Sequence, residues 1–190
     1  MSKLFQYGGI VASIVLIAFG AGSIVTGLNG RDRVHRDLTA EQIIGTPDSS
    51  IPNQLVNNGS KAEAFAAVMR KHTLEATGGK TYSQMDRYMG KDGKSTSDEK
   101  LAAVDPKSGK PVDNPLRNLW VSETALTTAL HSSYFAESVA TFAIVMGFAL
   151  MLTGGGFLVL TLRVLRVFSK ETASEEAAAA IEPGKVALSS

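Results

Sequence analysis

The sequence has no cysteine, only three histidines and a single tryptophan among its 190 residues. The absence of cysteine excludes disulfides, thiolate catalysis, Cys-ligated zinc and iron–sulfur clusters, and it fits any redox compartment. An excess of one charge is also missing, because 19 basic residues stand against 18 acidic ones. A near-neutral chain therefore gives no electrostatic argument for nucleic acid or an acidic substrate as a partner.

Motifs of catalysis and nucleotide binding are absent as well. The chain contains no G-x-S-x-G, GxxxxGK[ST], GxGxxG or HExxH pattern. A metal site needs two or three converging ligands, whereas His35, His72 and His131 are scattered along the chain. The sequence thus predicts no catalytic residue, no metal ligand and no cofactor, and it favours a non-enzymatic protein.

Charge is missing altogether from two long apolar segments, residues 9–28 and 138–162. Twenty helical residues extend about 30 Å, the hydrocarbon thickness of a bilayer, so each segment is typical of a transmembrane helix. The first segment, preceded by Lys3, also resembles a secretory signal peptide. Its apolar run is longer than the usual h-region, which favours an uncleaved anchor.

Basic residues beside the spans predict the orientation. Arg163 and Arg166 follow the second span and place the C-terminus in the cytoplasm by the positive-inside rule. Arg31, Arg33 and Arg36 follow the first span and argue the other way, but the rule weakens for long connecting segments. We expect a multi-pass protein of the bacterial inner membrane with both termini cytoplasmic.

This topology divides the chain into five parts. They are a short cytoplasmic N-terminus (1–8), the first span (9–28), an extracytoplasmic domain (29–137), the second span (138–162) and a flexible cytoplasmic tail (163–190). The tail is predicted to form only fleeting helix around Ala177–Ile181. Residues predicted to lie at the membrane interface are Arg31, Arg33, Arg36, Tyr134, Phe135, Arg163 and Arg166.

Small residues within the spans predict helix packing. Their four-residue spacing allows another helix backbone to approach closely, and the other span of this chain is the favoured partner over a second copy or a larger complex. Three successive glycines in the second span favour a tight contact over a lipid-exposed bend. The predicted helix-packing residues are Ala18, Gly22, Thr26, Ala143, Gly147, Gly154, Gly155 and Gly156.

The segment between the spans is predicted to be partly irregular and otherwise helical. Residues 29–60 are rich in turn formers after a cluster of charges, with a short helix near 39–44. Capping boxes at Ser60 and Thr81 predict helices over 61–77 and 81–89, and a third short helix is expected over 98–104. Asn114 before Pro115 predicts the start of a helix that continues into the second span, with Trp120 packed on the two preceding helices.

Two stretches carry a family resemblance, KHTLEATGGKTYSQMDRYMGKDGKSTSDEK (71–100) and NLWVSETALTTALHSSYFAE (118–137). Together with EQIIGTPD (41–48) and both spans, they resemble an uncharacterised family of small actinobacterial two-span membrane proteins. The resemblance implies no activity and no functional residue. Proteins of this family can carry the label of ring-opening dioxygenase, which this sequence supports little. A non-heme iron site of that kind needs two histidines and a carboxylate on a rigid scaffold.

The sequence therefore predicts an all-α membrane protein with two transmembrane helices and a small, partly irregular helical extracytoplasmic domain. Its expected partners are the lipid bilayer and a membrane protein or a second copy, with no nucleic acid. The leading hypothesis is an envelope scaffold or interaction protein. The alternatives are an accessory subunit of a larger transport or respiratory complex, and a metal-dependent enzyme.

Overall fold

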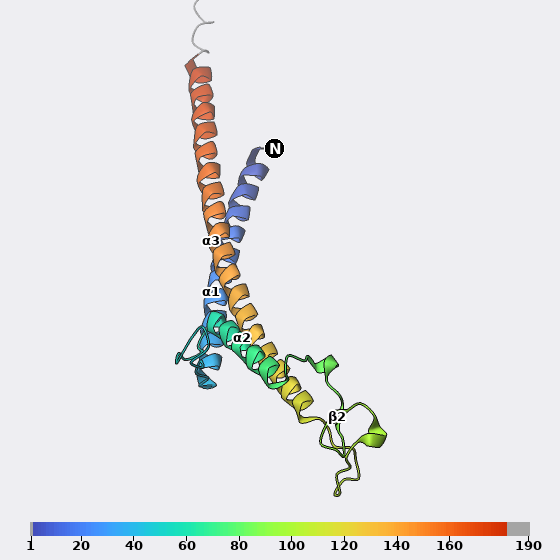
Figure 1. Cartoon of the computed structure of the whole chain (residues 1–190). Coiled ribbons are helices and arrows are strands. Elements are labelled where there is room, and N and C mark those ends of the chain that lie inside the picture. Colours follow the sequence, from blue (N-terminus) through green and yellow to red (C-terminus); the bar gives the residue numbers. More distant parts are fainter. Residues whose placement is uncertain (1, 182–190) are drawn as a thin grey trace, which may run out of the picture. The chain divides into compact units, whose positions relative to one another are not determined.

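The computed structural model of the chain describes residues 2–181 and is 69% helical (Figure 1). Three α-helices dominate these residues: α1 (Ser2–Ala40), α2 (Gly59–Ala76) and α3 (Pro115–Ile181). Both α1 and α3 contain a stretch long and apolar enough to cross a membrane, and only 11% of each stretch is buried. The prediction of a mostly helical chain with two such helices is confirmed.

The chain forms two compact units. One, which we call the helix pair, comprises the chain up to Leu28 and from Thr141 onward. The other, which we call the central module, comprises Asn29–Ala140. Both α1 and α3 contribute residues to each unit, because each helix extends beyond the apolar stretch that the sequence marks as a span.

The start of α3 is where the sequence predicts it. Leu116 donates its backbone N–H to the side-chain oxygen of Asn114 over 3.0 Å, and Pro115 occupies the first helical position, where its missing N–H costs nothing. The end of α3 differs from the prediction, because the helix continues through the expected tail to Ile181. Alanine and glutamate favour helix, and extending an existing helix needs no new nucleus. Residues 182–190 of the predicted tail lie outside the described residues.

The end of α1 also corrects a prediction. Residues 29–40 were expected to be irregular, but α1 runs through them to Ala40. Gln42 then takes a left-handed φ of 51°, which ends the helix where a short helix near 39–44 had been expected. Ile44 pairs with Leu55 in an isolated bridge and closes the turn-rich segment between them into a compact loop.

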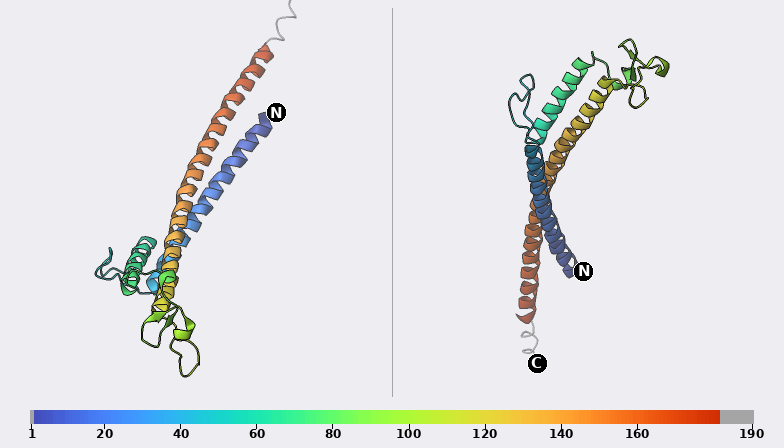
Figure 2. Two further views of the ribbon diagram at one scale, coloured as in Figure 1. Left: turned by 45° about the vertical axis from the view of Figure 1, so that its right-hand side comes forward. Right: turned by 90° about the horizontal axis from the view of Figure 1, so that it is seen from below.

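The core of the central module lies between α2 and its neighbours, and Figure 2 (right) shows α2 beside the first part of α3. Its buried residues include Leu38 of α1, Val56 of the loop, Phe65 of α2 and Leu130 of α3. The α2 N-cap is Asn58, whose side chain accepts the N–H of Lys61 over 2.9 Å. Ser60, the predicted cap, already lies inside the helix, since asparagine is at least as good a cap and comes first.

Short elements occupy the rest of the central module, where two more helices had been predicted. A 3₁₀ turn, η1 (Tyr82–Gln84), and strand β1 (Tyr88–Met89) replace the expected helix over 81–89, and a second 3₁₀ turn, η2 (Glu99–Leu101), replaces the one over 98–104. The capping box predicted at Thr81 is present, with Gln84 accepting the Thr81 N–H over 2.8 Å. It caps one turn only, because β1 pairs antiparallel with β2 (Ser95–Thr96) around a turn at Gly93.

Candidate functional site

The helix pair is held together by small residues at seven-residue intervals. Gly147 of α3 lies against Gly20 of α1, and Gly154 lies against the backbone of Ser13. Because the residue number rises along α1 as it falls along α3, these segments are antiparallel. Small residues every seventh position suit two helices that wrap closely around each other, since the heptad keeps one narrow seam in register. Gly147 and Gly154 were among the predicted packing residues, whereas Ser13 and Gly20 were missed.

The seam is tight enough to exclude a side chain. A β-carbon on Gly154 would lie 2.9 Å from the carbonyl oxygen of Ser13, and one on Gly9 would lie 2.8 Å from the hydroxyl of Thr161. Ser13 is fully buried, and its hydroxyl donates to the Gly9 carbonyl over 2.8 Å within the same helix. The Ser13 hydroxyl is therefore hydrogen-bonded although the side chain is buried between the two helices.

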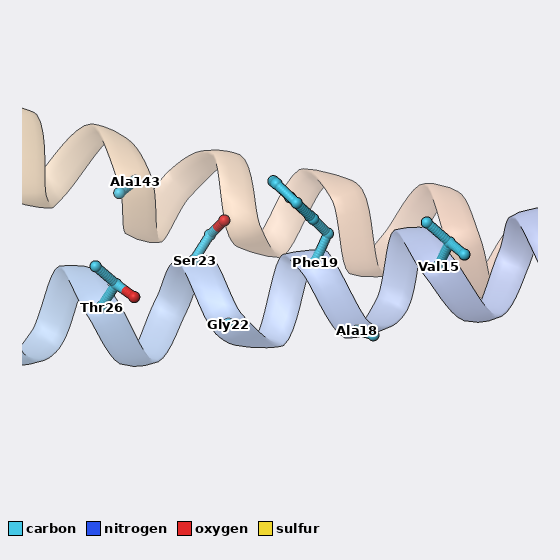
Figure 3. Close-up of a pocket in the computed structure, with 7 residues that line it drawn as sticks. All are labelled: Val15, Ala18, Phe19, Gly22, Ser23, Thr26 and Ala143. Carbon is cyan, nitrogen blue, oxygen red and sulfur yellow. The ribbon is translucent and has the colours of Figure 1, made fainter.

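A second set of small residues on α1 lies outside this seam. It forms an open groove of about 560 Å³, shown in Figure 3. A β-carbon on Gly22 would meet nothing within 4 Å. The groove is lined by Val15, Ala18, Phe19, Gly22, Ser23 and Thr26 of α1 and by Ala143 of α3.

The predicted packing residues thus divide into separate sets. Gly147 and Gly154 lie in the seam, whereas Ala18, Gly22, Thr26 and Ala143 line the open groove. A β-carbon on Gly155 or Gly156 would meet nothing within 4 Å. The intrachain contact that the spacing favoured therefore includes Gly147 and Gly154 on α3, where Ser13 and Gly20 meet them from α1. α1 has small residues on two faces, and spacing alone does not say which face meets α3.

Glu137 joins three segments of the central module. Its carboxylate accepts the backbone N–H of Gly59, the first residue of α2, and lies 2.9 Å from Nε2 of His35 and 3.5 Å from Nε of Arg31. Partial burial raises the pKa of Glu137, but the Gly59 N–H, His35 and Arg31 together bring this pKa below its ordinary value. A carboxylate at a helix N-terminus is also stabilised by the positive end of the helix dipole. This cluster fixes α1, the start of α2 and α3 against one another.

A second ion pair lies deeper in the same module. The Glu123 side chain is only 2% exposed, and its carboxylate is 3.4 Å from the guanidinium of Arg70 on α2. The guanidinium also covers the ring of Trp120, 4.1 Å from the ring centroid. Trp120 therefore packs against α2, as predicted, while its predicted contact with a helix over 81–89 has no counterpart because that helix is not formed. Glu123 was not among the predicted site residues, although it shares a helical face with Trp120 and Leu130.

A third cluster is exposed. Asp48, in the loop that follows α1, accepts hydrogen bonds from His72 over 2.9 Å and Lys71 over 3.0 Å. The His72 and Lys71 hydrogen bonds, with one from Thr46, hold the pKa of Asp48 well below its usual range. The Asp48 carboxylate in turn raises the pKa of Lys71. The cluster ties the loop to α2 near the end of that helix.

The described residues contain no group of three or more histidine, aspartate or glutamate side chains that could hold a metal ion. His35 and His72 each pair with a different carboxylate, Glu137 and Asp48, and His131 is exposed on α3. This arrangement does not assemble the two histidines and one carboxylate that a non-heme iron site requires.

The predicted interface residues have different surroundings. Arg31 belongs to the Glu137 cluster, whereas Arg33, Arg36, Arg163 and Arg166 are exposed. Tyr134 and Phe135 are 38% and 68% exposed. Their placement at a membrane surface stays a prediction.

Comparison of the chain with protein-family models, with curated proteins and with solved structures finds no match. The chain's own residues are therefore the basis for proposing a function.

Proposed function

We propose that the chain is a two-span integral membrane protein that works as a non-enzymatic scaffold, with the central module as the part that partners recognise. The observation that carries the proposal is the outward-facing apolar surface of the helix pair. Phe19, Phe142 and Leu152 are 71%, 64% and 77% exposed. Transfer of each such side chain out of water is worth about 1.5–3 kcal/mol, so a surface of this kind is favourable in lipid and costly in water.

The central module supports the scaffold role through the ion pairs that join its elements. Glu137 and the Arg70–Glu123 pair connect α1, α2 and α3 at separate points, while Asp48 secures the loop. A module whose elements are fixed in this way presents a constant surface to a partner. Arg163 and Arg166 after the second span favour a cytoplasmic C-terminus and, with it, a central module outside the cytoplasm.

Single-cysteine labelling tests both insertion and orientation, because the chain has no cysteine of its own. Lys91→Cys marks the central module and Ser174→Cys marks the region after the second span; both positions are exposed. In intact cells, a membrane-impermeant maleimide is expected to label Lys91→Cys, and Ser174→Cys only after lysis. The reverse pattern would overturn the orientation, and release of the protein from membranes by alkaline carbonate would overturn insertion.

The open groove favours a second candidate function, that of an accessory subunit in a larger membrane complex. Within lipid, small residues let another helix approach closely, and the space beside Gly22 is unfilled. The mass of the particle extracted in mild detergent separates the two functions. A stoichiometric complex that Gly22→Leu disrupts supports the subunit role, whereas an unchanged monomer in both forms contradicts it.

A further inference from the structure

A small polar cavity lies at the start of α3, in a part of the central module that the scaffold proposal does not use. Its volume is about 220 Å³, below the roughly 300 Å³ at which pockets begin to hold drug-sized ligands. A cavity of this size can hold one small molecule or one end of a larger ligand. Its lining includes Tyr82, Arg87, Tyr88, Asp113, Arg117 and Asn118.

The walls are held by hydrogen bonds that converge on Asn114. Its backbone N–H donates to the Arg87 carbonyl over 2.9 Å, and its side-chain amide donates to the Asp86 carbonyl over 2.9 Å. Tyr88 stands opposite Asp113 in an antiparallel bridge, which places these two residues side by side. The segment around Arg87 is thus fastened directly to the first turn of α3.

Arg117 is fixed before any ligand arrives. One guanidinium nitrogen donates to the Met85 carbonyl over 2.8 Å, and the guanidinium covers the Tyr82 ring at 3.9 Å from the centroid. A guanidinium has five N–H donors, so others remain for a ligand. An arginine that is already oriented loses little side-chain entropy when it binds a carboxylate.

The charges of the cavity do not neutralise one another. Arg87 and Asp113 line the same space, yet among residues 2–181 neither side chain makes an ion pair or side-chain hydrogen bond. Two arginines and one aspartate therefore line the same small space, and Arg87 and Asp113 are both exposed. A simple anion would leave Asp113 unmatched, whereas a ligand that carries a carboxylate and an ammonium group would match all three charges.

We propose that this cavity binds a small zwitterion of the α-amino acid type, with its carboxylate at Arg87 and Arg117 and its ammonium group at Asp113. Tyr82, Tyr88 and Asn118 also line the cavity. This inference goes beyond the scaffold proposal and does not depend on it, because none of the ion pairs that support the scaffold role involves a residue of the cavity.

Binding to the full chain in detergent, screened by saturation-transfer NMR with each standard amino acid at millimolar concentration, tests the proposal. For an amino acid that binds, Arg87→Gln is expected to lower affinity about tenfold or more, as loss of a charged hydrogen bond implies. Lys91→Gln removes the same charge from the same module outside the cavity and is expected to leave affinity unchanged. Arg117 is a poorer choice for substitution, because it also supports Met85 and Tyr82.

The ammonium position has its own test. Asp113→Asn is expected to weaken binding of the free amino acid but to leave binding of its N-acetyl derivative unchanged. Binding of inorganic phosphate without binding of any amino acid would overturn the proposal, as would no amino acid binding at all. Equal losses in Arg87→Gln and Lys91→Gln would also overturn it, since they would show only an effect of net charge.

Discussion

Gly20 and Gly147 approach each other so closely that a β-carbon on either one would lie 2.6 Å from the carbonyl oxygen of the other. Real β-carbons do not come within 3.0 Å of such an atom, and the obstacle on each side is backbone, which has little freedom to move. Hydrogen is the only side chain that this crossing accepts. The seam of the helix pair therefore requires glycine at both of these positions.

Gly20→Ala and Gly147→Ala are each expected to destabilise the helix pair by about 1–3 kcal/mol, the usual cost of overpacking. Thermal unfolding of the full chain in detergent, followed by far-ultraviolet circular dichroism, measures the effect as a lower Tm. Gly22→Ala is the matched control. Its β-carbon enters open space, and alanine favours helix by about 1 kcal/mol over glycine, so its Tm is expected to stay constant or rise. Equal Tm losses in all three variants would contradict the seam.

Glu137→Gln is expected to destabilise the central module by about 1–3 kcal/mol, because a charged acceptor shared by Gly59, His35 and Arg31 becomes neutral. Folding lowers the pKa of Glu137. The contribution of its carboxylate to the free energy of unfolding is therefore present above the unfolded pKa, about 4.3, and is lost as the pH falls through the lower folded pKa. Urea unfolding at several pH values measures this. The variant's loss of stability relative to wild type should shrink on acidification, while exposed Glu75→Gln shows little loss at any pH.

Arg70→Ala is expected to cost about 1–3 kcal/mol, since it leaves Glu123 buried without its cation and uncovers Trp120. Addition of Glu123→Gln is expected to restore part of this loss, because a neutral amide is cheaper to bury than an unpaired carboxylate. The single tryptophan reports directly on the site through its fluorescence during urea unfolding. A double variant no more stable than Arg70→Ala would show that the pair contributes little.

Asp48 is expected to titrate well below the usual aspartate pKa of about 3.9, because His72, Lys71 and Thr46 hydrogen-bond to its charged form. Because folding lowers the pKa of Asp48, its contribution to the free energy of unfolding is complete above the usual aspartate pKa. That contribution is lost only as the pH falls below this pKa. Carbon NMR of the Asp48 carboxyl measures the midpoint. His72→Ala is expected to move the midpoint upward, and an unchanged midpoint would contradict the cluster. The site is exposed, so global stability should change little.

Several local features were predictable from neighbouring residues. Asn114 and Pro115 mark the start of α3 because a cap and its helix are adjacent in sequence, and the two charge-free stretches mark long apolar helices for the same local reason. The capping boxes were less reliable. The N-cap of α2 is Asn58, two residues before the predicted Ser60. Thr81 caps a single turn, because the residues that follow form a strand in which Tyr88 pairs with Thr96. Pairing of distant segments overrides local propensity.

By itself, then, the sequence determined where the apolar helices lie, where α3 begins, and that catalytic motifs are missing. Tertiary structure decided which face of α1 meets α3, because small residues occur on two faces and only the packing selects Ser13 and Gly20 over Ala18 and Gly22. It also decided the roles of Glu137 and Arg87. Glu137 gains its partners from residues 78 and 102 positions away, and Arg87 shares a cavity with Asp113 through a bridge between distant segments. Local patterns specify elements, whereas the meeting of distant charges depends on how the chain folds back on itself.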